Sequence, residues 1–139
     1  MTFGNLRKNL GQTSKEGSYE LLRFCNKLNT TVIGGASKLF KYFVKTYSPE
    51  KVISYADRRW SEGKLYHNLG FDFVHNSNPN YFYVKNSTIE LEARFKYRKD
   101  ILVSQGYDKN KTEKEIMKEL GYNRIYDCGA MKFEWKKEV

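Results

Sequence analysis

The chain has 139 residues, and its 25 lysines and arginines against 16 aspartates and glutamates give a formal charge of +9. Apolar residues make up 40% and aromatic residues 16%, too much large side-chain mass for a disordered tail, so one folded domain is expected. No apolar run approaches the roughly 20 residues of a membrane span and no secretion signal is recognisable, so we expect a cytoplasmic protein. Cys25 and Cys128 lack metal-ligand spacing, which predicts two buried free thiols and no metal site.

A strand, helix, strand unit is predicted in the first half of the chain. Residues 19–25 (YELLRFC) leave few polar positions and predict a buried strand. After Gly34 and Gly35, the segment ASKLFKYFVKTY has its apolar residues on one helical face and its lysines on another. Pro49 ends this helix, and VISYAD (52–57) is typical of a parallel strand that is covered on both faces.

The rest of the chain is predicted to alternate short helices and strands. In chain order these are a helix at 61–69, antiparallel strands at 71–75 and 81–85, helices at 90–104 and from 112, and a terminal hairpin at 124–135. The last helix begins with TEKE, a capping box formed by Thr112 and Glu115.

The predicted fold is therefore a single α+β domain, a mixed sheet with flanking helices. Residues 1–89 would form its core with the strand, helix, strand unit, and residues 90–139 its C-terminal helices and hairpin.

The segment VIGGASK (32–38) lies between the first predicted strand and the helix. Glycines there let a phosphate approach the backbone, and the helix N-terminus favours an anion; a tight packing turn is the alternative. Together with LYHNLGF at 65–71, this order resembles the GNAT (acyl-CoA N-acyltransferase) fold, in which a Q/R-x-x-G-x-G/A turn binds the pyrophosphate of acetyl-CoA. The resemblance implies that the cofactor contacts would be Gly34, Gly35 and Ala36.

In the same fold the tyrosine of the L-Y-x-x-x-G-F segment often acts as general acid toward the leaving thiolate, a role that the resemblance gives to Tyr66. Packing of the short helix is the alternative role for this residue. Thr31 stands where the family has Gln or Arg, and only 33 residues precede Gly34 where the family has some 70 or more. We therefore expect acetyl-CoA to bind weakly or not at all.

A narrower resemblance covers essentially the whole chain. The strings ELLRFCNKLNTTVIGGASKLFKYF, ISYADRRWSEGKLYHNLGF, PNYFYV and RIYDCGAMKFEW resemble the C-terminal region of phage homing endonucleases whose nuclease domain is related to very-short-patch-repair enzymes. In that family the nuclease domain lies upstream of a GNAT-like domain, and its acidic and histidine cluster has no counterpart here. The resemblance implies an accessory module and does not imply cleavage.

Basic residues interleaved with aromatic residues favour a polyanionic partner, and a solvated surface is the alternative. Asp57-Arg58-Arg59-Trp60 follows a predicted strand at its C-terminal end, where two guanidinium groups can bind phosphates and an indole can stack. An ion pair with Asp57 and a buried Trp60 is the alternative there. The predicted nucleic-acid contacts are Lys38, Lys41, Arg58, Arg59 and Trp60, together with Arg94 and Arg98 on one face of the helix at 90–104.

The sequence thus predicts a noncatalytic nucleic-acid-binding module that needs no metal or cofactor. An acetyl-CoA-dependent N-acetyltransferase and a phage structural protein that binds another protein are the two alternatives. Residues 1–6 or the strand at 19–25 should expose an unpaired apolar edge, because the strands that precede them in the GNAT fold are not in the chain. The basic spacer at 7–17 has only Leu10 as an apolar residue and cannot cap this edge well by itself. The terminal hairpin at 124–135, a second copy of the chain or a different protein could cover it, and we expect one of the last two.

Overall fold

The computed structural model describes the whole chain except residues 8–10, 12 and 139. The predicted spacer at 7–17, with Leu10, therefore lies partly outside the described residues. Among the residues that are described, no helix has the length and apolar character needed to cross a lipid bilayer.

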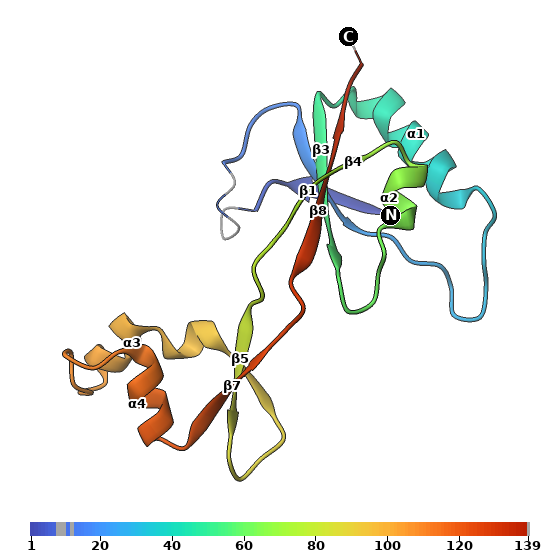
Figure 1. The fold of residues 1–139 in the computed structure, drawn as a ribbon. Helices are drawn as coiled ribbons and strands as arrows, with labels where there is room; N and C mark the ends of the chain where they lie inside the picture. The colour runs from blue at the N-terminus through green and yellow to red at the C-terminus, as the bar shows by residue number, and fades with distance from the viewer. Residues whose placement is uncertain (8–10, 12, 139) are drawn as a thin grey trace. The chain divides into compact units, whose positions relative to one another are not determined.

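The chain forms two compact units (Figure 1). Unit 1 contains Met1–Asn78 and Gly129–Val139, and unit 2 contains Pro79–Cys128. Unit 2 is thus inserted between two parts of unit 1. The predicted core at 1–89 differs from unit 1 in two ways: it includes residues 79–89, which belong to unit 2, and it leaves out residues 129–139, which belong to unit 1.

Unit 1 is built on a five-stranded mixed sheet in the order β1-β2-β3-β8-β4. β2 and β3 run parallel, and the other neighbouring strands run antiparallel. The strands are β1 (Thr2–Asn5), β2 (Ser18–Arg23), β3 (Lys51–Asp57), β4 (Asp72–Asn76) and β8 (Ala130–Lys136). The predicted α+β class with a mixed sheet is confirmed, and the finer resemblance to the GNAT fold stays a prediction.

The predicted strand, helix, strand unit is confirmed by β2, α1 (Gly35–Tyr47) and β3. Helix α1 is amphipathic, and its buried Phe40 and Phe43 pack on the sheet. The ring of Phe3 on β1 stacks on Phe43 with 3.5 Å between ring centroids. Phe43 of α1 contacts Phe3 of β1 and also Tyr19 of β2, so α1 fixes the position of β1 beside β2.

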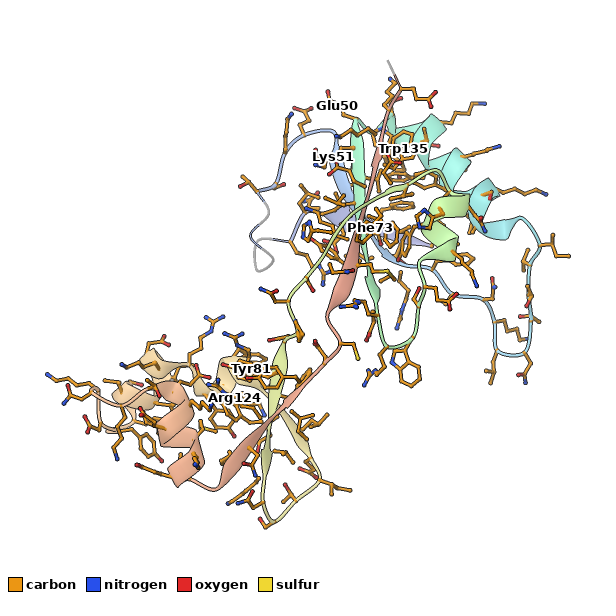
Figure 2. The ribbon with its side chains drawn as sticks, viewed as in Figure 1. Glu50, Lys51, Phe73, Tyr81, Arg124 and Trp135 are labelled. Carbon is orange, nitrogen blue, oxygen red and sulfur yellow. The ribbon has the colours of Figure 1, made fainter. Side chains whose placement is uncertain are left out.

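Phe133 of β8 lies at the centre of the unit 1 core and is fully buried. Tyr66 of helix α2 (Lys64–Asn68) stacks on it with 4.8 Å between ring centroids, and Phe73 of β4 meets it edge to face at 5.9 Å. Two residues further along β8, Trp135 meets Phe40 of α1 edge to face at 5.5 Å (Figure 2). One strand therefore anchors both helices.

Unit 2 contains a three-stranded antiparallel sheet in the order β6-β5-β7. Its core is formed by Tyr83, Leu102, Ile116 and Met117. The elements are β5 (Tyr81–Lys85), β6 (Leu91–Ala93), the 3-10 helix η2 (Arg94–Tyr97), α3 (Lys99–Ser104), α4 (Glu113–Glu119) and β7 (Tyr122–Tyr126).

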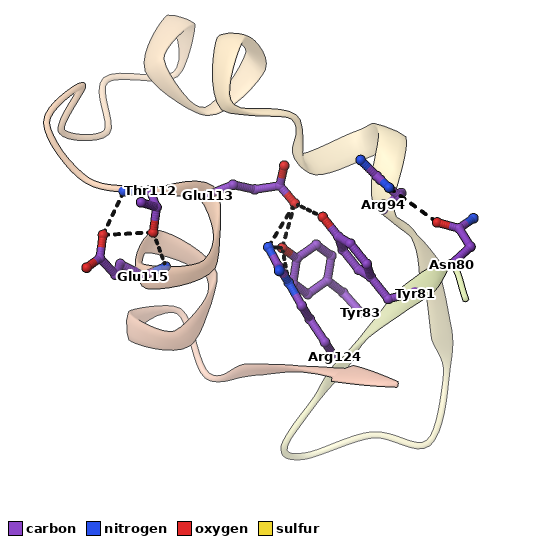
Figure 3. Close-up of polar contacts among 8 residues, drawn as sticks. All are labelled: Asn80, Tyr81, Tyr83, Arg94, Thr112, Glu113, Glu115 and Arg124. Carbon is purple, nitrogen blue, oxygen red and sulfur yellow. Dashed lines mark hydrogen bonds and ion pairs between the residues drawn. The ribbon is translucent and has the colours of Figure 1, made fainter. Parts of the chain in front are cut away.

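The predicted capping box at the start of α4 is confirmed (Figure 3). The amide of Glu115 donates to Thr112 Oγ1 at 3.3 Å, and the amide of Thr112 donates to Glu115 Oε2 at 2.7 Å. Both hydrogen bonds satisfy amides that the helix itself leaves without an acceptor.

Two predicted strand pairs are wrong. The strands predicted at 71–75 and 81–85 correspond to β4 and β5, which belong to different sheets, and the predicted hairpin at 124–135 is divided between β7 and β8. The side chains explain the difference: β7 pairs with the tyrosine-rich β5, whereas Phe133 of β8 pairs across from Ser54 and Phe73. A turn signal in the sequence does not say whether the chain folds back or crosses to another sheet.

The helix predicted at 90–104 is wrong in its first half. Leu91–Ala93 pairs with β5 as β6, and only Lys99–Ser104 is α-helical. Arg98 has extended backbone angles, φ −59° and ψ 147°, between η2 and α3. Arg94 and Arg98 therefore do not share a helix face.

The prediction that both cysteines are buried is wrong, because Cys25 and Cys128 are both exposed. Cys25 lies beyond Arg23, where β2 ends, and Cys128 lies at the boundary between the two units. Neither position belongs to a strand.

β1 covers the outer edge of β2 and is itself the edge strand of the unit 1 sheet. An unpaired apolar edge was expected at residues 1–6 or 19–25, and the edge position falls to the first of these. Pairing of β1 with a second copy or with another protein stays a prediction.

Replacement of Gly63 by alanine tests the packing around Phe133. Gly63 has φ +78°, and a Cβ atom there would lie 2.4 Å from Phe133 Cζ. We expect Gly63→Ala to lower the free energy of unfolding by at least about 2 kcal/mol, since a strained backbone and an overpacked ring both contribute. The measurement is denaturant unfolding followed by circular dichroism.

Gly34→Ala is the matched control. Gly34 has φ +69°, and a Cβ atom there meets nothing within 4 Å, so only the backbone term of about 1–2 kcal/mol applies. Equal losses in the two variants would contradict the packing of Gly63 against Phe133.

Candidate nucleic-acid interface

Most of the excess positive charge belongs to unit 1. It contains 15 of the 25 lysines and arginines and 8 of the 16 aspartates and glutamates, a balance of +7, whereas unit 2 contains 10 and 8, a balance of +2. Counterion release on a polyanion requires cations that are not already neutralised by neighbouring acids. The search for an interface therefore begins with the exposed cations of unit 1.

Helix α1 presents a basic face. Lys38, Lys41 and Lys45 are exposed, and the helix contains no acidic residue. Among the described residues none of the three has an ion-pair partner. At about 1.5 Å of rise per residue, the three ammonium groups follow the helix axis over roughly 10 Å. The sequence prediction included Lys38 and Lys41, and the structure adds Lys45.

The segment that follows β3 carries the second cluster of predicted contacts. The amide of Arg59 donates to Asp57 Oδ1 at 2.8 Å, and the guanidinium group lies 4.8 Å from the centroid of the Trp60 ring. Arg59 Nη2 is 3.7 Å from Asp57 Oδ2, an exposed pair that contributes little stability. Trp60 is 78% exposed, so the alternative of a buried tryptophan is wrong.

An open hollow of about 510 Å³ lies at this segment. Its lining includes Arg58, Arg59, Trp60 and Lys64, with Glu62 as the acidic member. Glu62 pairs with Lys64 at 2.6 Å. Two guanidinium groups beside an exposed indole can bind a phosphate and stack on a base.

The parallel pairing of β2 and β3 relates the two clusters. Because parallel strands end at the same sheet edge, the segment 24–34 and the segment 58–63 both leave the sheet at that edge (Figure 1). Helix α1 begins at the end of the segment 24–34, and Lys38 lies in its first turn. The structure thus places Lys38 and the Arg58–Trp60 segment at one end of unit 1.

The glycine turn before α1 has the geometry of a helix entry. Gly34 is the N-cap residue in the left-handed conformation, without a side-chain cap. The amide of Gly35 donates to the carbonyl of Val32 at 3.1 Å, and a Cβ atom on Gly35 would lie 3.0 Å from Val32. Gly34, Gly35 and Ala36 therefore form a tight turn whose packing alone explains the second glycine.

Tyr66 has structural partners for both its ring and its hydroxyl group. The ring packs on Phe133, and Tyr66 Oη lies 3.0 Å from Ser54 Oγ and 3.4 Å from the carbonyl of Tyr55. This geometry accounts for the residue as a packing element of α2. As a general acid, it would have to exchange these partners for a substrate.

Arg94 and Arg98 belong to unit 2, whereas the two clusters described above belong to unit 1. The guanidinium group of Arg94 lies 4.6 Å from the centroid of Tyr81, and its Nη1 donates to Asn80 Oδ1 at 3.3 Å (Figure 3). Arg98 is exposed at the start of α3. Each is therefore a separate candidate contact.

Unit 2 also contains a polar network that the sequence analysis missed. Glu113 Oε1 accepts from the hydroxyl groups of Tyr81 and Tyr83, both at 2.7 Å, and pairs with Arg124 at 3.4 Å (Figure 3). Burial, followed by the hydrogen bond to Glu113, raises the pKa of Tyr83 and of Tyr81 above the ordinary value of 10.0. The available signal in the sequence was the spacing of these residues: Tyr81 and Tyr83 in one strand, and Tyr122, Arg124 and Tyr126 in its partner strand, each recur at every second position.

Comparison with protein-family models and with curated proteins finds no match to this chain. In the part of the chain that the structure describes, no group of three or more His, Cys, Asp or Glu side chains is placed to hold a metal ion.

Replacement of Glu113 tests the network in unit 2. In Glu113→Ala, Tyr81, Tyr83 and Arg124 lose a shared acceptor, and we expect the free energy of unfolding to fall by about 1–3 kcal/mol at neutral pH. Because the tyrosine pKa values are raised in the folded chain, their contribution is complete below about pH 10 and is lost as pH rises through the folded values. The variant should therefore also ionise tyrosine at lower pH in an ultraviolet titration.

Glu119→Ala is the matched control, because it removes an exposed pair with Lys111 and should cost less than about 1 kcal/mol. A tyrosine titration that is identical in Glu113→Ala and the unaltered chain would contradict the network.

Proposed function

We propose that this protein is a noncatalytic nucleic-acid-binding module, an accessory part of a phage or mobile-endonuclease lineage. The observation that carries the proposal is the placement of Lys38, in a helix with three unpaired lysines, and of Arg58, Arg59 and exposed Trp60 at one end of unit 1. Lys38, Lys41, Arg58 and Arg59 contact backbone phosphates, and Trp60 stacks on an accessible base. Arg94 and Arg98 are further contacts, supplied by unit 2.

The charge pattern favours phosphates over a merely solvated surface. On a solvated surface, cations alternate with acids, as in the pairs Lys64–Glu62 and Lys111–Glu119. Helix α1 has three lysines and no acid. A row of cations without acids repels itself and gains free energy when a polyanion replaces its counterions.

Salt dependence tests the proposal. The six proposed phosphate contacts predict a log-log slope of about −5.4 for duplex DNA, and Arg58→Ala with Arg59→Ala should make it less steep, at about −3.6. The measurement is the fluorescence anisotropy of a labelled duplex between roughly 50 and 200 mM salt. The loss of affinity should be similar for unrelated sequences, because phosphate contacts do not read bases.

Lys15→Ala with Lys136→Ala is the matched control. It removes the same charge at two positions outside the predicted contacts, and the slope should stay near that of the unaltered chain. An affinity that does not change with salt would show that the proposal is wrong.

The second candidate function is an acetyl-CoA-dependent N-acetyltransferase. The described parallel pairing of β2 with β3 ends at Glu20–Ile53. Beyond this pair the two strands continue toward the start of α1 without pairing to each other, and this feature favours the second candidate. The resemblance to the GNAT fold assigns Gly34, Gly35 and Ala36 to the cofactor and Tyr66 to the proton. The exposed Thr31, which cannot reach a phosphate as Gln or Arg would, opposes it.

Calorimetric titration with acetyl-CoA separates the two candidates. We expect no saturable binding in the low micromolar range. Saturable binding that disappears in Gly35→Glu would favour the second candidate, and Tyr66→Phe should then reduce turnover while cofactor affinity is kept.

A further inference from the structure

A second basic hollow lies within unit 2, and its described lining includes none of the nucleic-acid contacts that were predicted from the sequence. It encloses about 270 Å³ between α4 and β7, and its lining includes Lys114 and Lys118 of α4 and Tyr122, Arg124 and Tyr126 of β7. Of the described residues that line it, none is acidic. The hollow belongs to one compact unit, so its shape is set by contacts within that unit.

The network around Glu113 builds this hollow. Arg124 Nε and Nη2 donate to Tyr83 Oη at 3.1 and 3.0 Å, and Arg124 lies 4.1 Å from the centroid of Tyr81. Glu113 ties the first turn of α4 to the same guanidinium group (Figure 3). The helix is thereby held over β7, and the lysines that follow Glu113 are kept at the rim.

The two lysines supply charge that no acid neutralises. Lys114 and Lys118 are exposed, and neither side chain forms a hydrogen bond or an ion pair with another described residue. At i and i+4 on one helix, their side chains begin about 5–6 Å apart, close enough for both to approach one phosphate group. Glu113 balances Arg124, so the two lysines leave the hollow with an excess of about two positive charges.

The wall of the hollow is aromatic. Tyr122 and Tyr126 lie two strand positions to either side of Arg124, so all three side chains project from the same face of β7. Tyr126 is more than half exposed. A cationic rim with an accessible aromatic wall suits a phosphate joined to an unpaired base, as in single-stranded nucleic acid.

We propose that the hollow between α4 and β7 binds a backbone phosphate of a single-stranded nucleic acid through Lys114 and Lys118, with the adjoining base stacked on Tyr126. This inference rests on the proposed function and adds a contact site in unit 2 to the one in unit 1.

The test is the affinity of the full chain for a labelled oligonucleotide. In Lys114→Gln with Lys118→Gln, the log-log salt slope on a single strand should become less steep by about 1.4. Tyr126→Leu should weaken single-strand binding at least about fivefold and leave duplex binding unchanged, whereas Tyr126→Phe should keep both. Lys96→Gln with Lys111→Gln removes the same charge at positions paired with Glu92 and Glu119, and its slope should not change.

The outcomes separate this inference from the proposed function. If Lys114→Gln with Lys118→Gln leaves the slope unchanged while Arg58→Ala with Arg59→Ala reduces it, the hollow is not a contact and the site in unit 1 stands. If the unaltered chain binds neither duplex nor single strand, both proposals are wrong. If inorganic phosphate alone shifts the amide resonances of Lys114 and Lys118 as the oligonucleotide does, the hollow takes a free anion and the nucleic-acid assignment is overturned.

Discussion

The position of β8 between β3 and β4 holds unit 1 together. β3 pairs with it from Lys51–Lys136 to Asp57–Ala130, and β4 lies at the edge of the described sheet, where it pairs with β8. The ring of Tyr66 stacks on Phe133 of β8, and the Phe133 ring leaves no room for a side chain at Gly63. The segment with the two arginines and the exposed tryptophan lies between β3 and α2, so its two ends are fixed by elements that pack on β8.

The two units deal with their charges differently. In unit 2, the buried tyrosine core needs a carboxylate and a guanidinium group to satisfy its hydroxyl groups, and that demand places Glu113 opposite Arg124. In unit 1, the side chains of Lys38 and Lys41 form no ion pair with a described residue, and Lys45 lies in the last turn of α1, where the helix dipole favours a cation. Side chains of the first kind are explained by stability. Lys38 and Lys41 pair with no acid among the described residues, and they are the natural candidates for recognition.

Local patterns in the sequence were sufficient where neighbours in the chain decide the structure. The amphipathic α1, the capping box of α4 and the parallel pairing of β2 with β3 all followed from periodicity, caps and crossover rules. The pairing of β8 could not be predicted in this way, because its partners are separated from it by the whole of unit 2. A hairpin costs less loop entropy than a distant pairing, so the sequence favoured it, but Phe133 gains more burial between β3 and β4.

The candidate site divides along the same line. Arg58, Arg59 and Trp60 are consecutive, so the sequence predicted their proximity and the structure adds the exposure of the indole. The predicted pairing of Arg94 with Arg98 required one continuous helix over 90–104. Because Leu91–Ala93 pairs with β5 and Arg98 is extended, the two arginines do not share a helix face. The hollow in unit 2 combines one helix and one strand through a partly buried ion pair, which no local pattern indicates.

The inserted unit closes on itself at both of its joints. Within unit 2, the amide of Asn80 donates to the carboxylate of Asp127 and the amide of Asp127 donates to the carbonyl of Asn80, each at 2.8 Å. Within unit 1, the amide of Ser77 donates to the carbonyl of Ala130 at 2.7 Å. Ends that meet in this way are what a grafted module requires. We expect that exchange of residues 79–128 for a short turn or for another small domain would leave β4 and β8 in register. The sheet of unit 1 could then keep its strand pairing with or without the inserted unit.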